Sequence, residues 1–403
     1  MYKRYRHRNN GQGGGRRFNG NRFSSKFRKS DAEIVRAIQA VRISDGEPGD
    51  LQNETYVAQN NFESFPISPR LKKNIFYKKY SFPTPIQDRV IPAILENKDI
   101  IGIANTGTGK TAAFLIPLIE KVLRNREERV LILTPTRELA MQISDELYGF
   151  AYGMEVGWAL CIGGTNIQTQ SRNLKKHPHF VVGTPGRLKD LAQKGELILS
   201  EFTAVVLDEA DRMVDIGFLE DIKYFIERLP VKRQSLFFSA TIPPKVNQIL
   251  KTFVKDPITV SVKVRDSIAN IRQDIIKING NITKVDRLHD LLIQEEFEKV
   301  LIFGRTKWGV QKLSNELVGR GFNAAAIHGN KTQNQRQKVL DDFKNNKINI
   351  LLATDVASRG IDVQDISHVI NYDLPVSYED YIHRIGRTGR ANKKGVALTF
   401  VEN

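Results

Sequence analysis

The chain has 403 residues, of which 40% are hydrophobic and 26% charged, and its formal net charge at pH 7 is +16. This length predicts about two domains with substantial apolar cores. The single cysteine, Cys161, excludes an intramolecular disulfide and favours a reducing, cytoplasmic compartment. No run of about 18 apolar residues is present, so we expect no membrane span, and the basic, polar amino terminus predicts no secretory signal.

Residues 1–30 carry ten Lys or Arg and no acid, with Phe and Tyr scattered among glycines. This composition predicts a disordered tail that binds nucleic acid by neutralising phosphates and stacking on bases. A tail that only aids solubility is the alternative. Residues 31–61 predict a short amphipathic helix, with Ile34, Ile38 and Val41 on one face, followed by a linker.

Short apolar segments alternate with helical patterns from residue 62 onward. Strands are expected at 99–103, 130–134, 158–162, 180–183, 204–207, 236–239 and 258–262, and again at 274–278, 300–303, 324–328, 350–354, 368–371 and 396–400. Continuous apolar strands separated by helices predict parallel sheets covered on both faces. The chain therefore predicts two doubly wound α/β domains, 62–262 and 272–403, joined by a polar hinge at 263–271 and separated by a cleft.

A phosphate-binding loop is predicted at residues 104–111, Ala-Asn-Thr-Gly-Thr-Gly-Lys-Thr, between a strand and a helix. Its glycines allow the backbone to approach phosphates, Lys110 would reach the outer phosphates, and Thr111 would bind Mg²⁺. The acidic run 208–211 follows another strand. There Asp208 would hold the same Mg²⁺, and Glu209 would orient or deprotonate the attacking water. Together the two motifs predict ATP hydrolysis.

The second half contains three arginines three residues apart, in the sequence His383-Arg-Ile-Gly-Arg-Thr-Gly-Arg390. Arg387 and Arg390 are predicted to stabilise charge on the transferred phosphoryl group. A surface helix paired to acids is the alternative.

Four strand ends carry residues suited to a phosphate backbone. In Thr134-Pro-Thr-Arg137 and Thr184-Pro-Gly-Arg187, a threonine is expected to cap a helix, a proline to occupy its first position, and an arginine to lie in its first turn. Gly163-Gly164 permits close approach, and Thr354-Asp355 ends a strand in the second half. Each is explained by an ordinary helix cap, but four along one edge favour a nucleic-acid track.

These motifs, with Phe62, residues 83–87 (Pro-Thr-Pro-Ile-Gln), Ser239-Ala-Thr241 and Gln333-Asn-Gln-Arg336, resemble those of the DEAD-box ATP-dependent RNA helicases over residues 62–403. Residues 325–331 are most similar to the bacterial RhlE-like branch. The resemblance implies two RecA-like domains and a monomer that binds RNA without sequence preference and unwinds short duplexes or remodels RNA–protein complexes. The open alternatives are a DNA helicase and a non-hydrolysing, ATP-gated RNA clamp.

The resemblance also implies residue roles. Gln87 would read the adenine edge while Phe62 stacks on its ring. The remaining nucleotide contacts would be Asn105, Thr106, Gly107, Thr108, Gly109, Lys110, Thr111, Gly360 and Asp362. Ser239, Thr241 and His383 would couple the ATP state to RNA binding. The RNA contacts would be Pro135, Thr136, Arg137, Gly163, Gly164, Thr184, Gly186, Arg187, Arg305, Gly329, Thr354 and Asp355.

Three positions depart from the family pattern: Lys79, Asn105 and Asn392. None removes a catalytic group, although Asn105 alters a contact in the nucleotide site. His177 and His179 lie close together, but without further ligands at metal-binding spacing they favour a loop over a metal site.

Overall fold

The computed structural model describes residue 56 and residues 58–105, 107–262, 270–278, 282–358, 363, 365–389 and 393–402, together with Ala32, Val35, Arg36, Ile38 and Gln39. Several sequence predictions fall outside these residues. They are the tail 1–30, Ile34 and Val41 of the expected amphipathic helix, residues 263–269 of the expected hinge, and the roles of Thr106, Gly360, Asp362, Arg390 and Asn392.

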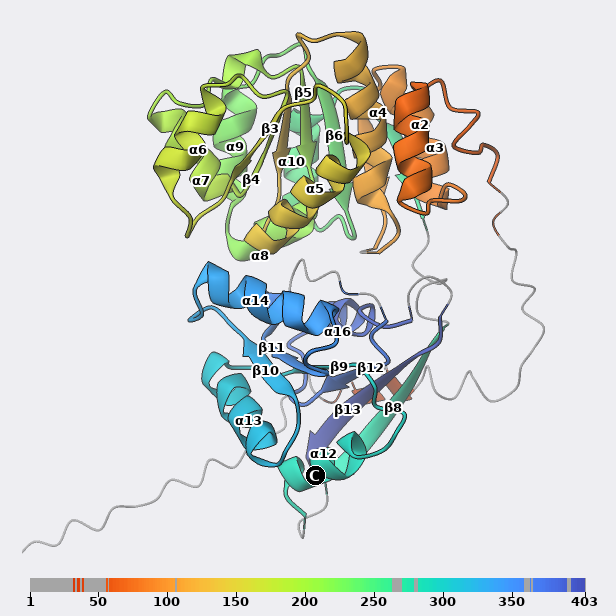
Figure 1. Ribbon diagram of the computed structural model, residues 1–403, viewed down its shortest axis with the longest axis vertical. Helices are drawn as coiled ribbons and strands as arrows, with labels where there is room; N and C mark the ends of the chain where they lie inside the picture. Colours follow the sequence, from red (N-terminus) through yellow and green to blue (C-terminus); the bar gives the residue numbers. More distant parts are fainter. Residues whose placement is uncertain are drawn as a thin grey trace, which may run out of the picture.

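The first domain is built on a seven-stranded parallel sheet with the order β3-β4-β2-β5-β6-β1-β7 (Figure 1). Its strands are β1 Ile100–Ile103, β2 Val130–Leu133, β3 Trp158–Cys161, β4 Phe180–Gly183, β5 Ala204–Leu207, β6 Gln234–Ser239 and β7 Ile258–Ser261. Helices α2 Pro69–Tyr77, α3 Pro85–Leu95, α4 Lys110–Arg124 and α5 Arg137–Phe150 contribute to the core on one face. The other face packs against α6 Ile167–Leu174, α7 Pro185–Gln193, the short helix η1 Leu199–Glu201, α8 Ala210–Ile216, α9 Leu219–Arg228 and α10 Pro244–Phe253.

The second domain has a six-stranded parallel sheet with the order β10-β11-β9-β12-β13-β8. The strands are β8 Ile271–Ile278, β9 Val300–Phe303, β10 Ala324–Ile327, β11 Ile350–Ala353, β12 His368–Asn371 and β13 Gly395–Glu402. Helices α12 Lys284–Leu292 and α13 Lys307–Gly319 cover one face. Helices α14 Gln333–Lys344 and α15 Asp355–Ser358 cover the other, and α16 Tyr378–Ile385 belongs to a further cluster.

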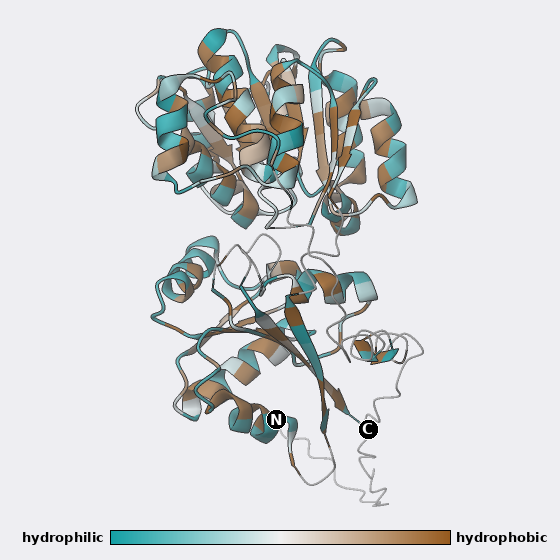
Figure 2. Cartoon of the chain, turned by 90° about the vertical axis from the view of Figure 1, so that its right-hand side faces the viewer, coloured by the Kyte–Doolittle hydropathy of each residue, from teal (hydrophilic) through white to brown (hydrophobic). Residues whose placement is uncertain are grey.

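Every strand predicted from an apolar run is present, and both sheets are parallel throughout. The strands are hydrophobic while the outward faces of the helices are polar (Figure 2), as expected for sheets buried on both sides. The predicted doubly wound α/β architecture is therefore confirmed. Within the described residues, no helix has both the length and the apolar character needed to cross a membrane.

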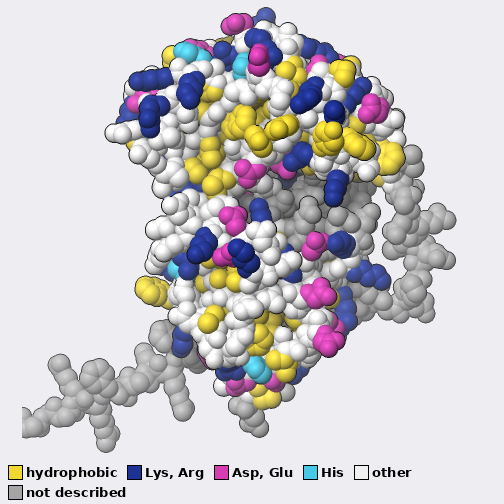
Figure 3. Space-filling view, in the orientation of Figure 1, with side chains coloured by type: hydrophobic (Ala, Val, Ile, Leu, Met, Phe, Trp, Pro, Cys, Tyr) yellow, Lys and Arg dark blue, Asp and Glu magenta, His cyan; other side chains and the backbone are white. Residues whose placement is uncertain are grey.

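The two domains contact each other at the carboxyl ends of their strands. Helices α5 and α8 lie at the lower edge of the first domain, facing α14 and α16 of the second (Figure 1). Glu138 of α5 accepts hydrogen bonds from Gln333 Nε2 and Arg336 Nη2 of α14, each at 3.0 Å. Lys and Arg side chains also lie over α14, directly below the waist between the domains (Figure 3). Ligands of parallel sheets bind at this edge, so the candidate site lies between the domains.

The chain contacts the second domain before it enters the first. The described positions between residues 32 and 39 are helical, as the sequence predicts, and the Ile38 side chain is fully buried against residues of β8, β13 and α16. Farther along, Asp88 of α3 accepts hydrogen bonds from Tyr56 Oη (2.5 Å), Gln59 N (2.8 Å) and Asn60 N (3.1 Å). These bonds fix the segment that leads into the first domain.

Candidate active site at the interdomain cleft

The phosphate loop follows β1 and turns sharply into α4. Gly107 and Gly109 adopt φ angles of +84° and +89°, the left-handed region that glycine enters without penalty. At Gly109 a Cβ atom would lie only 2.4 Å from Gln87 Nε2, so close approach also requires glycine. Lys110 is 6% exposed, and its Nζ donates to the Ala104 carbonyl at 2.5 Å. The lysine thus lies over the loop whose backbone amides would receive phosphate oxygens.

Gln87 braces the phosphate loop. Its Oε1 accepts from Thr84 N at 2.9 Å and its Nε2 donates to the Gly109 carbonyl at 3.0 Å, while Thr84 Oγ1 donates to the Thr108 carbonyl at 2.8 Å. The sequence predicts only an adenine contact for Gln87, and this bracing role was missed. The Gln87 side chain is fully buried, so its contact with the adenine edge stays a prediction.

Phe62, the predicted stacking residue, packs into the hydrophobic core of the first domain. Its side chain is 5% exposed, and its ring meets the rings of Phe65 and Tyr80 at centroid distances of 5.9 and 6.1 Å. Both contacts are edge-to-face, the geometry that favours packing of aromatic rings. Stacking of Phe62 on adenine stays a prediction, and it has to use the small part of the ring that is accessible.

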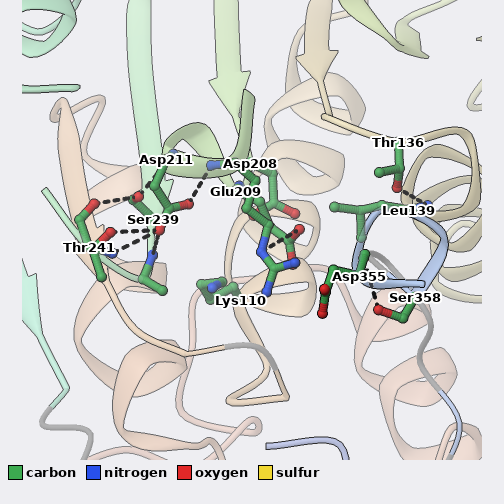
Figure 4. A network of polar contacts seen from close by, with 12 residues as sticks. Lys110, Thr136, Leu139, Asp208, Glu209, Asp211, Ser239, Thr241, Asp355 and Ser358 are labelled. Atoms are coloured by element: carbon green, nitrogen blue, oxygen red, sulfur yellow. Dashed lines mark hydrogen bonds and ion pairs between the residues drawn. The ribbon is translucent and has the colours of Figure 1, made fainter. Parts of the chain in front are cut away.

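The acidic motif emerges from β5 with Asp208 buried at 2% exposure. Burial raises the pKa of Asp208 to about 7; Glu209 and Asp211 act in the same direction, and Lys110 opposes them. A buried carboxylate of this kind is stabilised in its charged form by a cation. Figure 4 shows Asp208 and Glu209 on the same side of the cleft as Lys110.

Glu209 has a φ of +51°, a left-handed conformation that is unusual for a residue with a side chain and costs about 1–3 kcal/mol. Strain of this kind gathers at functional sites. The Oε2 atom of Glu209 lies 3.5 Å from Arg212 Nε, and both side chains are 6% exposed. Glu209 is therefore held in place beside Asp208 at the amino terminus of α8.

The Asp208 carboxylate and the Thr111 hydroxyl fit Mg²⁺, a hard cation that prefers oxygen ligands. Within the described residues, no group of three or more His, Cys, Asp or Glu could hold a metal ion. Protein ligands alone would thus leave Mg²⁺ incompletely coordinated, and phosphate oxygens and water would have to complete its shell, as is usual for this ion.

Asp211 links the acidic motif to the end of β6. Its Oδ2 accepts from Thr241 N and Thr241 Oγ1, both at 3.0 Å, and from Ala240 N at 3.2 Å. Ser239 Oγ accepts from Asp211 N at 3.2 Å and donates to the Thr241 carbonyl at 2.7 Å. Figure 4 shows this closed network. A displacement of the acidic motif would therefore be transmitted to Ser239 and Thr241.

The arginines of the second domain have different environments. Arg384, on α16, is 2% exposed and makes a bidentate ion pair with Asp355, Nε–Oδ1 at 2.6 Å and Nη2–Oδ2 at 2.8 Å. It also donates to Asn371 Oδ1 at 3.1 Å and the Asp373 carbonyl at 2.7 Å. Arg384 therefore anchors α16 to its own domain. The equal spacing of the arginines does not show this difference.

Arg387 and His383 face the first domain. With Arg384 and Asp355, they line a small cavity whose wall includes Arg212 from the acidic motif's helix. Arg387 is 4% exposed. Burial, and then the charge of Arg212, lower the pKa of His383 to about 3, so this histidine is neutral at pH 7. The structure thus places Arg387 of the second domain at the same small cavity as Arg212, the ion-pair partner of Glu209 in the first domain.

Arg137 is the centre of the predicted backbone-binding edge. Its guanidinium packs on Gly163 and Gly164, where a Cβ atom would lie 2.7 and 2.3 Å from Arg137 nitrogens. The paired glycines therefore make room for this arginine. Burial lowers the pKa of Arg137; the negative charge of Glu138 opposes this effect, and the positive charges of Arg336 and Arg187 add to it. Guanidiniums are well suited to bind phosphate oxygens.

The two helix starts along this edge differ. Thr184 precedes α7, with Pro185 at its first position and Arg187 in the first turn, as predicted. At α5 the cap is Thr136, whose side chain accepts from Leu139 N at 3.3 Å, and Arg137 is the first helical residue. The prediction that Pro135 occupies the first helical position was wrong, because the helix begins two residues later than the shared pattern implies.

The residues of the second domain that were predicted to contact RNA differ in their surroundings. Arg305 is exposed and donates from Nη2 to the Leu374 carbonyl at 3.3 Å, and the position of Gly329 leaves open space where a Cβ would be. Asp355 is already paired with Arg384, so its carboxylate supports α16 rather than a backbone contact. The Glu138 contacts with Gln333 and Arg336 were missed, although residues 333–336 stood out as a motif.

The comparisons with known proteins agree with these features. The family model DEAD/DEAH box helicase matches residues 84–250, and Helicase conserved C-terminal domain matches residues 283–392. ATP-dependent RNA helicase CshA of Limosilactobacillus reuteri is 45% identical over 341 residues, which cover 84% of this chain and 69% of that protein. The similarity to an RhlE-like branch stays a prediction.

Two solved structures differ in how well they superpose. S. cerevisiae Dbp5 bound to RNA and ADP BeF3 gives a TM-score of 0.77 at 32% identity, covering 85% of this chain and 90% of that one. A DEAD box protein from the hyperthermophile Methanococcus jannaschii gives 0.52 at 41% identity, covering 85% and 93%. The more identical sequence therefore superposes less well over the same share of this chain.

Proposed function

This chain belongs to the DEAD-box RNA helicase family, and we propose that it hydrolyses ATP in the interdomain cleft to unwind short RNA duplexes or remodel RNA–protein complexes. The observation that carries the proposal is the position of Arg387 and His383 beside Arg212, on the other side of the cleft from the phosphate loop. Each domain holds part of a phosphoryl-transfer site, so the site is complete only when the domains meet.

In the proposed reaction, the loop amides and Lys110 bind the triphosphate, and Gln87 pairs with the adenine edge. Thr111 and Asp208 would hold Mg²⁺, which neutralises charge on the phosphates. Glu209 lies at the strained start of α8 and would take the proton of the attacking water. Arg387 would stabilise the charge that develops on the transferred phosphoryl group, and Arg390 has the same proposed role.

RNA would bind along the edge defined by Arg137, Gly164, Thr184 and Arg187, with Arg305, Gly329 and Thr354 on the second domain. Guanidiniums and helix amino termini recognise phosphates without reading bases. The Asp211–Ser239–Thr241 network would couple the nucleotide and RNA sites. A monomer in the cytoplasm is our working expectation.

A steady-state ATPase assay with single-stranded RNA, single-stranded DNA or no nucleic acid tests the proposal. We expect RNA to stimulate hydrolysis and DNA to have little effect. Equal stimulation by DNA would support a DNA helicase. Binding of ATP and RNA without turnover would support a clamp, and either result would overturn the proposal.

A further inference from the structure

The helix that carries His383, α16, has a second side that faces away from the cleft. Residues on an α-helix are separated by about 100° per residue, so Tyr381 lies about 200° from His383 around the helix axis. Tyr381 and Ile385 form the outer face, and both are fully buried. They are covered by Ile38, which precedes the first domain in sequence and is also fully buried.

The same cluster contains Ile271 of β8 and Ala397 of β13. Ile271 contacts the turn after α16, because a Cβ atom at Gly389 would lie 2.6 Å from Ile271 Cγ1. Gly389 has a φ of +67° and lies two residues after Arg387. Ile38 therefore packs into a cluster that supports both the helix bearing His383 and the turn bearing Arg387.

The two sides of α16 are held by different forces. On the inner side, Arg384 fixes the helix to Asp355, Asn371 and the Asp373 carbonyl. On the outer side, Tyr381 Oη donates to Gln273 Oε1 at 2.8 Å and also hydrogen-bonds with Thr399, and the other residues of the cluster are apolar. Buried aliphatic side chains stabilise such a contact by removing apolar surface from water. Loss of Ile38 would leave a gap against Tyr381 and Ile385.

We propose that Ile38 is a positioning residue: from its helical position upstream of the first domain it buttresses the outer face of α16 and so holds Arg387 in place for ATP hydrolysis. The inference rests on the proposed ATPase function. Ile38 lies outside the regions matched by the two family models, 84–250 and 283–392.

The test uses three substitutions in the full-length chain. Ile38→Asp places a charge in the apolar cluster, Ile38→Val keeps an aliphatic side chain there, and Gln39→Asp adds the same charge at an exposed neighbouring helical position. RNA-stimulated kcat and the KM for ATP are measured for each. Hydrogen exchange of the α16 amides reports directly whether the helix has lost its support.

We expect Ile38→Asp to raise α16 exchange and to lower kcat by about threefold or more, because transition-state charge stabilisation is impaired. The KM for ATP should change little, since Lys110 and Gln87 belong to the first domain. Ile38→Val and Gln39→Asp should behave like wild type. If wild type lacks RNA-stimulated hydrolysis, the proposed function fails. If wild type is active and Ile38→Asp keeps its kcat, the positioning role is wrong, whether or not exchange rises.

Discussion

The contact of Glu138 with Gln333 and Arg336 joins the two domains, so its strength predicts how tightly ATP binding and RNA binding are coupled. The Glu138 side chain is 3% exposed and that of Arg336 is 14% exposed, with 3.0 Å between Glu138 Oε1 and Arg336 Nη2. Removing one partner of a buried ion pair costs about 3–5 kcal/mol, because the other charge is left without compensation. When the domains separate, water can solvate Glu138, so the penalty applies to closure and not to folding of the first domain.

The substitution Arg336→Ala should therefore weaken the coupling between ATP and RNA. With Gln333 still donating to Glu138 at 3.0 Å, we take the lower end of the range, about 3 kcal/mol, which corresponds to about a 100-fold change in an equilibrium constant. The assay is fluorescence anisotropy of a labelled single-stranded RNA, with and without a non-hydrolysable ATP analogue. The ratio of the two Kd values measures the coupling.

Two further variants isolate the ion pair. Lys338→Ala removes one positive charge from an exposed position on the same helix, α14, and should leave the coupling unchanged. In a double-mutant cycle, Glu138→Gln should restore part of the coupling lost in Arg336→Ala, because it removes the buried charge that was left without compensation. Coupling within about threefold of wild type in Arg336→Ala, or full additivity in the cycle, would refute the reasoning.

Four other results are expected. Glu209→Gln should retain ATP binding and lose turnover, because an amide cannot accept the water's proton; hydrolysis within about threefold of wild type would contradict the role. Arg387→Ala should reduce the factor by which an ATP analogue and RNA raise each other's affinity in titrations, while thermal unfolding of the first domain is unchanged. Gln87→Ala should narrow the preference for ATP over GTP in competition assays, and unaltered discrimination would place adenine recognition elsewhere. Removal of residues 1–30 should leave the basal ATPase rate unchanged. The slope of log binding constant for RNA against log salt concentration should become smaller by about three to four, at about 0.7 per lost phosphate contact. An unchanged slope would mean that the tail only aids solubility.

The apolar runs predicted the sheets well because most strands are buried on both faces. β4 and β5 were predicted with the bounds that the structure shows, and all of their residues are buried. β8 and β13 are longer than predicted. They pair over eight residues, and β8, an edge strand, exposes Arg272 and Lys277. Polar residues on an exposed side interrupt the apolar pattern, so the ends of such strands cannot be predicted from apolar runs.

The sequence predicted the chemistry of the site better than its partners. Three arginines at equal spacing predicted a phosphate-binding group. The guanidinium of Arg384, however, is paired with the carboxylate of Asp355, which lies 29 residues upstream. The Glu138–Gln333 bond joins residues 195 positions apart. Helical spacing tells which residues share a face, but it does not tell which element covers that face. Contacts made by the fold as a whole therefore had to come from the structure.

For the same reason, the sequence did not predict what the segment around Ile38 packs against. Its periodicity predicted an apolar face that includes Ile38, but the surface beneath it is assembled from Ile271, Tyr381, Ile385 and Ala397, which belong to three separate elements. None of these residues carries a local signal for a partner more than 200 positions earlier in the sequence. The motifs of the catalytic domains identify the reaction, whereas Ile38 lies outside the regions the family models match. Its effect on Arg387 therefore has to be measured on this chain, with its upstream segment in place.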